Sequence, residues 1–192
     1  MIIGITGLIG SGKSTATDYF VSKGFLLVDA DIIGKEVVES NKSLLKKLVS
    51  EFGKEIVTPT YKLRRKKLAE LAFKDKQSTE KLNKLVHPYL LKEINTQIKR
   101  AKSRNIVIDA ALLIYWGLHK KIDFTLLVHA SLEDRIKRMK KRGYSEQQVK
   151  QITKRQLPYR ILQKRADRTI LNNRSAKDFI RKLDNFYQQL MS

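Results

Sequence analysis

A glycine-rich segment near the start of this 192-residue chain constrains its fold more than any other feature. Residues 7–14 read Gly-Leu-Ile-Gly-Ser-Gly-Lys-Ser and fit the pattern G-x-x-x-x-G-K-[ST] at every fixed position. The apolar residues 1–6 before it predict a short buried strand, and residues 15–21 after it predict a helix with Phe20 and Val21 turned inward. A strand, a glycine loop and a helix in this order form the context in which the motif binds phosphate. A glycine-rich turn with an incidental lysine is the alternative.

Each fixed residue type of this loop has a chemical reason. Glycines allow a tight backbone whose successive N–H groups surround phosphate oxygens, and the following helix contributes the positive end of its dipole. Lys13 is expected to reach the β- and γ-phosphates of a nucleotide, and the Ser14 hydroxyl to ligate Mg²⁺. The residues predicted to bind ATP are Gly10, Ser11, Gly12, Lys13, Ser14 and Thr15.

The composition excludes several classes of site. The chain has no cysteine, so disulfides, thiolate metal sites and cysteine nucleophiles are excluded. Its histidines, His87, His119 and His129, lack the spacing of metal ligands. No apolar stretch is long enough to predict a membrane span, and the first apolar run leads into the loop without the features of a signal peptide. We expect a cytoplasmic protein.

The charge balance is strongly basic, with 40 Lys and Arg against 19 Asp and Glu, a net charge of +21. Such a field attracts phosphates of any kind, including nucleotides and nucleic acid, but does not select among them. For most of the lysines we favour the simpler interpretation of a solvated charged surface.

Two carboxylates follow the second predicted strand, residues 25–28, in the sequence Asp29-Ala30-Asp31. The carboxyl ends of strands in α/β sheets are where ligands bind, so both are candidate functional residues. Asp31 also suits the N-cap of a helix beginning at Ile32, and the two roles are compatible.

Residues 32–103 predict a helical insertion. The pattern indicates two helices in residues 32–52, with a break near 41–43. It also indicates an amphipathic helix around 68–73, which begins with the basic residues 62–67. Ser78 is expected to cap a helix over 79–86, and His87-Pro88 to break it before a further helix. No strand is predicted from 44 to 102.

The α/β pattern then resumes. Residues 105–113 contain a third strand with Asp109 near its end, where a carboxylate facing Mg²⁺ and a simple turn residue are equally good interpretations. A fourth strand is expected at 124–129 and a fifth at 168–171. Ser175 is expected to cap a terminal helix whose inward side chains are Phe179, Leu183, Phe186, Tyr187 and Leu190.

A basic helical hairpin is predicted after the fourth strand, with Ser131 capping one helix through 142 and Ser145 opening another to 156. In phosphoryl-transfer enzymes such a hairpin closes over the nucleotide and supplies arginines to the transition state. The alternative for any one of these arginines is that it is a solvated surface residue with no role in phosphoryl transfer.

In this order, these segments resemble the dephospho-CoA kinase family, within the group of nucleoside-monophosphate-kinase-like proteins. The resemblance spans nearly the whole chain. It departs from the family where Ala111 and Tyr115 replace a usual Pro and Glu. It also departs at Tyr61, where the family often has Gly, and at Arg64, where it often has Asp. Its segments are the glycine loop, Asp29-Ala30-Asp31, Phe52-Gly53, Leu63-Arg64-Arg65, Leu68-Ala69, Phe73, His87-Pro88, Leu112-Leu113, Arg135, Arg138, Gln156, Ala166-Asp167, Ile170 and Asn172.

The resemblance implies a P-loop NTPase fold of class α/β, with three α/β/α layers, a five-stranded parallel sheet, a helical substrate-binding insert and a helical lid. It implies a single domain, 1–192. The nucleotide-binding core would be 1–31, 104–130 and 159–192, the acceptor (CoA) subdomain 32–103 and the lid 131–158.

The resemblance also implies ATP-dependent phosphorylation of the ribose 3′-hydroxyl of dephospho-CoA, with Mg²⁺. We expect a monomer, and no specific nucleic-acid partner, because the sequence lacks an aromatic platform or a recognition module. Asp31 would be the base and a second candidate metal ligand beside Ser14. Another small-acceptor P-loop kinase, acting on nucleoside monophosphates, and an ATP-switched nucleic-acid-binding protein are the alternatives. Together, the motifs and the resemblance give Asp31, Lys13, Arg138 and Arg142 as the candidate catalytic residues. They give Asp29, Arg65 and His87 as the candidate acceptor-binding residues.

Overall fold

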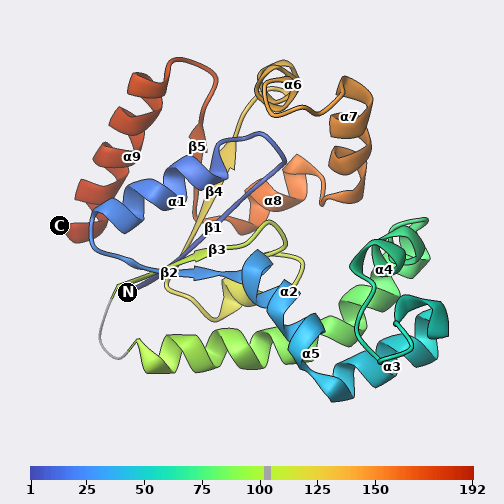
Figure 1. The fold of residues 1–192 in the computed structure, drawn as a ribbon. Coiled ribbons are helices and arrows are strands. Elements are labelled where there is room, and N and C mark those ends of the chain that lie inside the picture. The colour runs from blue at the N-terminus through green and yellow to red at the C-terminus, as the bar shows by residue number, and fades with distance from the viewer. Residues whose placement is uncertain (102–104) are drawn as a thin grey trace. The chain divides into compact units, whose positions relative to one another are not determined.

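The computed structural model describes residues 1–101 and 105–192. The chain forms two compact units: unit 1 comprises Met1–Asp29 and Ala101–Ser192, and unit 2 comprises Ala30–Arg100. Unit 1 contains the sheet and unit 2 is helical, as the labels in Figure 1 show.

The sheet of unit 1 has five strands in the order β2-β3-β1-β4-β5, and every neighbouring pair is parallel (Figure 1). This confirms the predicted α/β fold with a five-stranded parallel sheet. The predicted fourth and fifth strands match residue for residue, whereas the first and second are shifted by one residue. The strands are β1 (Ile2–Gly7), β2 (Leu26–Asp29), β3 (Ile106–Asp109), β4 (Phe124–His129) and β5 (Arg168–Leu171).

Helices cover both faces of this sheet. On one face, Ile5 of β1 and Val128 of β4 belong to an apolar cluster with Phe20 of α1 (Lys13–Ser22) and Leu183 of α9 (Ala176–Met191). Side chains alternate along a strand, so His129 faces the other way. There its ring stacks on Tyr159 of α8 (Tyr159–Arg165), with ring centroids 3.9 Å apart. The sheet is therefore the middle of three layers.

The helix starts of unit 1 follow the predicted caps. Ser131, Ser145 and Ser175 each accept a backbone hydrogen bond at the N-cap of α6 (Leu132–Lys140), α7 (Glu146–Arg155) and α9. Of the expected inward residues of α9, Phe179, Leu183 and Phe186 are buried, and Tyr187 and Leu190 are partly buried. The prediction for Val21 is wrong, because its side chain is 40% exposed while Phe20 takes the core-facing position. The remaining elements are α8, which was not predicted, and η2 (Leu118–Lys120), a 3₁₀ helix.

Unit 2 is built from helices that bury apolar side chains on one another. Buried residues include Ile33 of α2, Leu48 of α3, Leu68 of α4 and Ile94 of α5. No strand forms within residues 30–100, as predicted, although Val57 and Leu63 make an isolated antiparallel bridge. Its helices are α2 (Ala30–Ser40), α3 (Lys42–Phe52), η1 (Lys54–Ile56), α4 (Arg65–Ala72) and α5 (Lys76–Arg100).

Two predicted features of the last helix of this unit are wrong. α5 runs without a break through Pro88, and Ser78 lies inside it rather than at its N-cap. The side chain of Asp75 accepts the Ser78 N–H at 2.7 Å and caps the helix instead. A proline removes one helical hydrogen bond, but Leu90 and Ile94 just beyond it are fully buried, and that packing holds the helix together.

The expected N-cap role of Asp31 is also wrong. α2 begins at Ala30, immediately after β2, so Asp31 lies within the first helical turn and is not the capping residue. The helix expected to begin at Ile32 thus begins two residues earlier, directly after Asp29 of β2.

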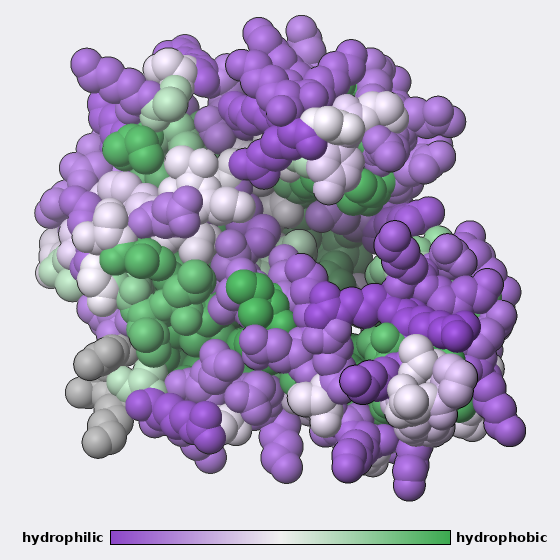
Figure 2. Space-filling model, in the orientation of Figure 1, coloured by the Kyte–Doolittle hydropathy of each residue, from purple (hydrophilic) through white to green (hydrophobic). Residues whose placement is uncertain are grey.

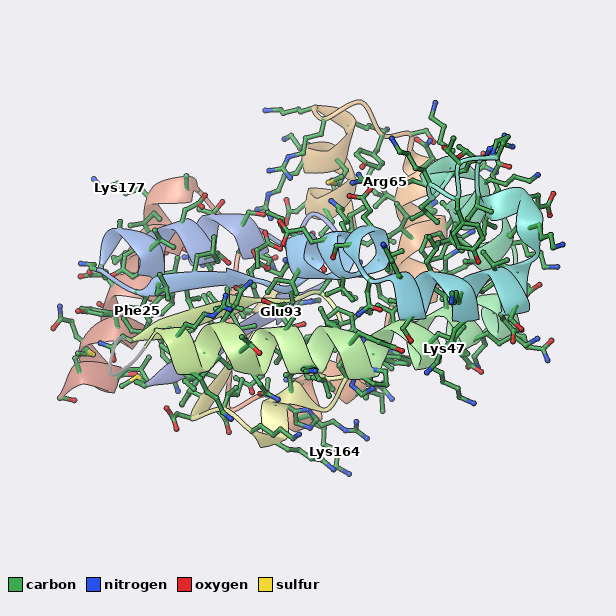
Figure 3. The ribbon with its side chains drawn as sticks, turned by 60° about the horizontal axis from the view of Figure 1, so that its bottom comes forward. Phe25, Lys47, Arg65, Glu93, Lys164 and Lys177 are labelled. Carbon is green, nitrogen blue, oxygen red and sulfur yellow. The ribbon has the colours of Figure 1, made fainter. Side chains whose placement is uncertain are left out.

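The surface agrees with the interpretation of a solvated charged shell. The face in Figure 2 is mostly hydrophilic, with a hydrophobic area around α1 and β2. Lys164 and Lys177 are exposed and point away from the ribbon in Figure 3. No helix in the described part of the chain has the length and apolar character needed to span a membrane.

Candidate active site

The glycine-rich segment forms the wall of a pocket of about 590 Å³ in unit 1. All six predicted ATP-binding residues line it, together with Arg138 and Arg142. Lys13, Ser14 and Thr15 open α1, and the first amide groups of a helix have no partner within the helix. They are suited to bind an anion. Other lining residues are Gly7, Leu8, Ile9, Ala111, Met139, Lys141, Ile152, Gln156, Asn172, Arg174, Ala176 and Phe179.

Two glycines are required by the backbone of this loop. Gly10 and Gly12 have φ angles of 75° and 102°, in the region that L side chains disfavour. A Cβ on Gly10 would in addition lie 2.8 Å from the carbonyl oxygen of Arg135. Any larger residue there would push the loop away from α6.

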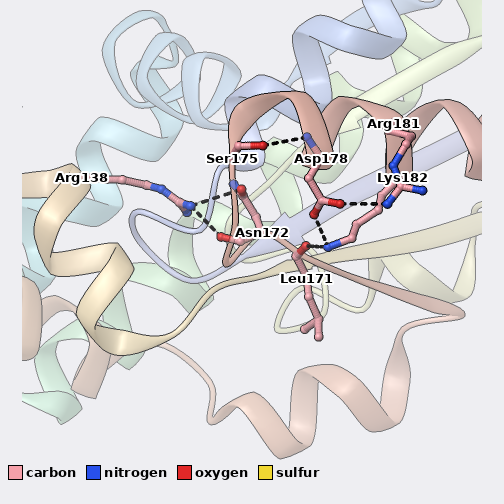
Figure 4. A network of polar contacts seen from close by, with 7 residues as sticks. All are labelled: Arg138, Leu171, Asn172, Ser175, Asp178, Arg181 and Lys182. Atoms are coloured by element: carbon pink, nitrogen blue, oxygen red, sulfur yellow. Dashed lines mark hydrogen bonds and ion pairs between the residues drawn. The ribbon is translucent and has the colours of Figure 1, made fainter.

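Two side chains that also line the pocket, those of Asn172 and Arg138, hold the carbonyl groups of the loop. The Asn172 amide donates to the Ser11 carbonyl at 2.9 Å, and the Arg138 guanidinium donates to the Gly10 and Ser11 carbonyls at 3.2 and 3.3 Å. Arg138 also donates to the Asn172 carbonyl and side-chain oxygens at 2.6 and 3.2 Å (Figure 4). With its carbonyls bound in this way, the loop keeps the conformation that presents its amide groups to a phosphate.

Ile9 connects the loop to the basic hairpin through both of its backbone groups. Its N–H donates to Gln156 Oε1 at 2.9 Å, and its carbonyl accepts from Arg135 at 3.5 Å. Arg135 is only 5% exposed and also donates to Thr153 Oγ1 at 3.0 Å. Burial lowers the pKa of the Arg135 guanidinium from its ordinary value. The hairpin is thus bonded to the loop from both of its helices.

Lys13, which lines the pocket, forms an ion pair with Asp109 at the end of β3. The Asp109 carboxylate is 7% exposed and accepts a second bond from Thr17 Oγ1 at 3.0 Å. Asp29 pairs with Asp109 in the register of β2 and β3, so both carboxylates lie at the carboxyl edge of the sheet. The ion pair therefore holds the charged group of Lys13 near the start of α1, where the glycine loop ends.

The charge of the pocket suits a polyphosphate. Lys13, Arg138, Lys141, Arg142 and Arg174 line it, and its lining residues include no Asp or Glu. Cations at this density in a concave site attract a polyanion and remain only partly screened by solvent.

The remaining predicted site residues belong to unit 2. Arg65 opens α4 and pairs with Glu39 of α2; its position is labelled in Figure 3. His87 lies half-buried in the middle of α5, and Asp31 is exposed in the first turn of α2. The structure assembles the nucleotide-side residues in one pocket, and the roles of these three stay predictions.

Sequence reasoning did not assign roles to several residues that build the site. Gln156 and Asn172 were noted only as points of resemblance, and Thr17 and Arg174 not at all. Asn172 comes directly after β5, at the sheet edge that binds ligands, and this position was the available signal.

Comparisons with known proteins identify the family of the chain. The family model described as dephospho-CoA kinase matches residues 1–178. A dephospho-CoA kinase of Corynebacterium glutamicum is 37% identical, with 98% of each chain covered. One of Acinetobacter baylyi is 36% identical over 100% of this chain and 95% of its own.

Solved structures agree with this result. The crystal structure of TT1252 from Thermus thermophilus matches with a TM-score of 0.82 at 32% identity, covering 99% of this chain and 97% of that one. A dephospho-CoA kinase from Campylobacter jejuni shares the fold, with a TM-score of 0.71 at 24% identity and coverage of 98% and 96%. By sequence over nearly its whole length, and by the fold and phosphate pocket described above, the chain belongs to the dephospho-CoA kinase family.

Proposed function

We propose that this kinase transfers the γ-phosphoryl group of ATP to the ribose 3′-hydroxyl of dephospho-CoA, giving coenzyme A and ADP. The observation that carries the donor half is the pocket of unit 1, where a preorganised glycine loop that includes Lys13 faces four further cationic side chains. Family membership supports the acceptor half.

Charge stabilisation is the main task of the donor side. Phosphoryl transfer requires in-line positioning of the two oxygens and stabilisation of the equatorial oxygens of the transferred group. Lys13 and the amide groups at the start of α1 supply this stabilisation, with Arg138 and Arg142 of the hairpin. Arg138 acts in part through the loop, because it already holds the Gly10 and Ser11 carbonyls.

On the acceptor side, Asp31 orients the ribose hydroxyl and accepts its proton as the phosphorus–oxygen bond forms. A positioned base of this kind contributes about 10²–10⁴-fold to a rate. Asp29, Arg65 and His87 are proposed to bind the acceptor. Residues 32–103 would then serve as the acceptor subdomain, 131–158 as the lid, and 1–31, 104–130 and 159–192 as the core.

Mg²⁺ fits the oxygen-bearing residues beside the loop. This ion takes few protein ligands, keeps several waters and binds substrate phosphates, so a hydroxyl and a carboxylate are sufficient. Ser14 and the buried Asp109 would hold it, with Asp31 as a further candidate. When bound, it neutralises charge on the β- and γ-phosphate oxygens.

An acceptor screen with ATP and Mg²⁺ tests this function. We expect dephospho-CoA to yield ADP and a product whose phosphorus NMR spectrum shows a new phosphomonoester on the ribose. Turnover of AMP, CMP or dTMP, with none of dephospho-CoA, would instead support a nucleoside monophosphate kinase.

We also propose that the enzyme acts as a cytoplasmic monomer and has no specific nucleic-acid partner. Its charge of +21 favours weak association with nucleic acid at low salt through counterion release. Gel-shift titrations are expected to show no sequence preference. A sequence-selective complex that survives at about 200 mM salt would favour the nucleic-acid-binding alternative.

A further inference from the structure

A short hairpin in unit 2 carries an unusual residue at its tip. The Tyr61 N–H donates to the Thr58 carbonyl at 2.9 Å across the turn, and the Thr58 N–H donates to the Lys62 carbonyl at 2.8 Å. Tyr61 has a φ of 59° and is the only non-glycine residue with positive φ in the described ranges 1–101 and 105–192. Glycine adopts this conformation freely, whereas a large L side chain is disfavoured there.

Burial in the core does not explain this tyrosine, because its side chain is 49% exposed. It lines an open hollow of about 610 Å³ on unit 2. Val49, Val57 and Pro59 contribute apolar surface to the same hollow. The turn therefore places an aromatic ring beside an apolar surface at the edge of the unit, at the expense of backbone strain.

The same hollow carries a net positive charge. Lys54, Glu55 and Arg64 also line it. Glu55 has a cationic partner outside the hollow, Lys67, at 3.6 Å. The structure shows no carboxylate within ion-pair distance of the Lys54 or Arg64 side chains, considering the residues it describes. The Arg64 N–H donates to the Ile56 carbonyl at 2.7 Å, which fixes the backbone of this residue beside the hollow.

We propose that this hollow binds the diphosphate and pantetheine arm of dephospho-CoA, an inference that rests on the proposed function. The arm is a long chain of apolar segments and amides joined to a diphosphate. This order of groups matches an aromatic and apolar surface next to two cations, Arg64 and Lys54. The Tyr61 ring contacts the arm, and the cations contact the diphosphate. An uncharged apolar segment would leave these two charges unmatched.

Replacing Tyr61 by glycine separates an effect on binding from an effect on folding. Loss of the ring should change the KM for dephospho-CoA, whereas relief of the strained positive φ should change the unfolding temperature. We expect Tyr61→Gly to raise the KM for dephospho-CoA by roughly tenfold, equivalent to about 1.4 kcal/mol of binding. The KM for ATP is expected to stay unchanged, and the unfolding temperature to stay the same or rise. Thr60→Ala, in the same turn but outside the hollow, is the matched control and should keep both KM values.

Inhibitors that correspond to the two halves of dephospho-CoA show which half the hollow binds. Phosphopantetheine and AMP are tested as inhibitors competing with dephospho-CoA. Tyr61→Gly should weaken inhibition by phosphopantetheine and leave inhibition by AMP unchanged. Arg64→Gln, a second variant that leaves the turn intact, should also weaken phosphopantetheine inhibition.

Three results would overturn the proposal. One is an unchanged KM for dephospho-CoA in both Tyr61→Gly and Arg64→Gln, and another is weaker inhibition by AMP alone. The third is a change of sedimentation with all kinetic constants intact, which would assign the hollow to a second copy of the chain. Absence of dephospho-CoA turnover in the wild type would instead contradict the proposed function, independently of these variants.

Discussion

The phosphate loop of unit 1 and the helices of unit 2 hold their candidate site residues in different ways. In unit 1, Asn172 and Arg138 hold the loop carbonyls, and Lys13 pairs with the buried Asp109. In unit 2, Arg65 pairs with Glu39 at the surface, where the two side chains are 60% and 39% exposed. Surface ion pairs hold geometry weakly. The loop of unit 1 is therefore fixed by several partners in this structure, and we expect the proposed acceptor-binding residues of unit 2 to depend more on the substrate for their final arrangement.

The largest effect is expected at Asp31, the proposed general base. Asp31→Asn keeps the size of the side chain and removes its charge, so kcat should fall by about 10²–10⁴-fold, with the KM for ATP changed far less. Steady-state kinetics measures both. If Asp31 serves only the start of α2, kcat will stay within about threefold of wild type, well short of a general-base effect. Asp29→Asn, at the end of β2, is the parallel variant and the replacement candidate in that case.

The next effect belongs to the preorganised side. Lys13→Ala removes one charge from the β- and γ-phosphates, and we expect kcat to fall by roughly 10²–10³-fold in a protein that remains folded. Circular dichroism checks the fold and a coupled ADP assay measures the rate. Lys23→Ala is the matched control, since Lys23 follows the other end of α1 and pairs with Asp184 at 3.1 Å. A folded Lys13→Ala enzyme with the wild-type rate would remove the loop from the mechanism.

The smallest effect is expected in the dynamics of the hairpin, residues 131–158. Its like charges repel until phosphate oxygens neutralise them, so amide exchange there should slow by about tenfold when an ATP analogue binds. The tip near Gly143 should change more than the base, where Gln156 and Arg135 already bind Ile9. Hydrogen exchange by mass spectrometry compares the two states. Equal protection in both would show that the hairpin is no lid.

Much of the fold was predictable because its signals are local. The buried strands are short apolar runs such as β4, and serine caps mark α6, α7 and α9. The continuous α5 was not predictable, because Pro88 is tolerated only through the packing of residues beyond it. The start of α2 at Ala30 likewise depends on the structure around it.

The glycine loop of the site was predictable from one motif, but the side chains that hydrogen-bond to the loop were not. Gln156 and Asn172 reach the loop from positions 147 and 161 residues away in sequence, and no local pattern reports such contacts. The positive φ of Tyr61 had a signal only in the resemblance, where the family often has glycine, because tyrosine itself carries no signal for that conformation. Sequence patterns identified the residues of the loop and Arg138, and assigned no role to Gln156 and Asn172, which hold the loop in place.

The hydrogen bonds of Ile9 have a consequence for unfolding and for the exchange of segments between related proteins. Its N–H and carbonyl are bound by side chains from the two ends of the hairpin, so neither the loop nor the hairpin can open without breaking hydrogen bonds of the other. Segments linked in this way unfold as one cooperative unit. The hairpin is therefore not an exchangeable module. A graft of residues 131–158 from a relative would have to bring compatible partners for Ile9, or the transplanted enzyme would lose the shape of its phosphate loop along with its hairpin.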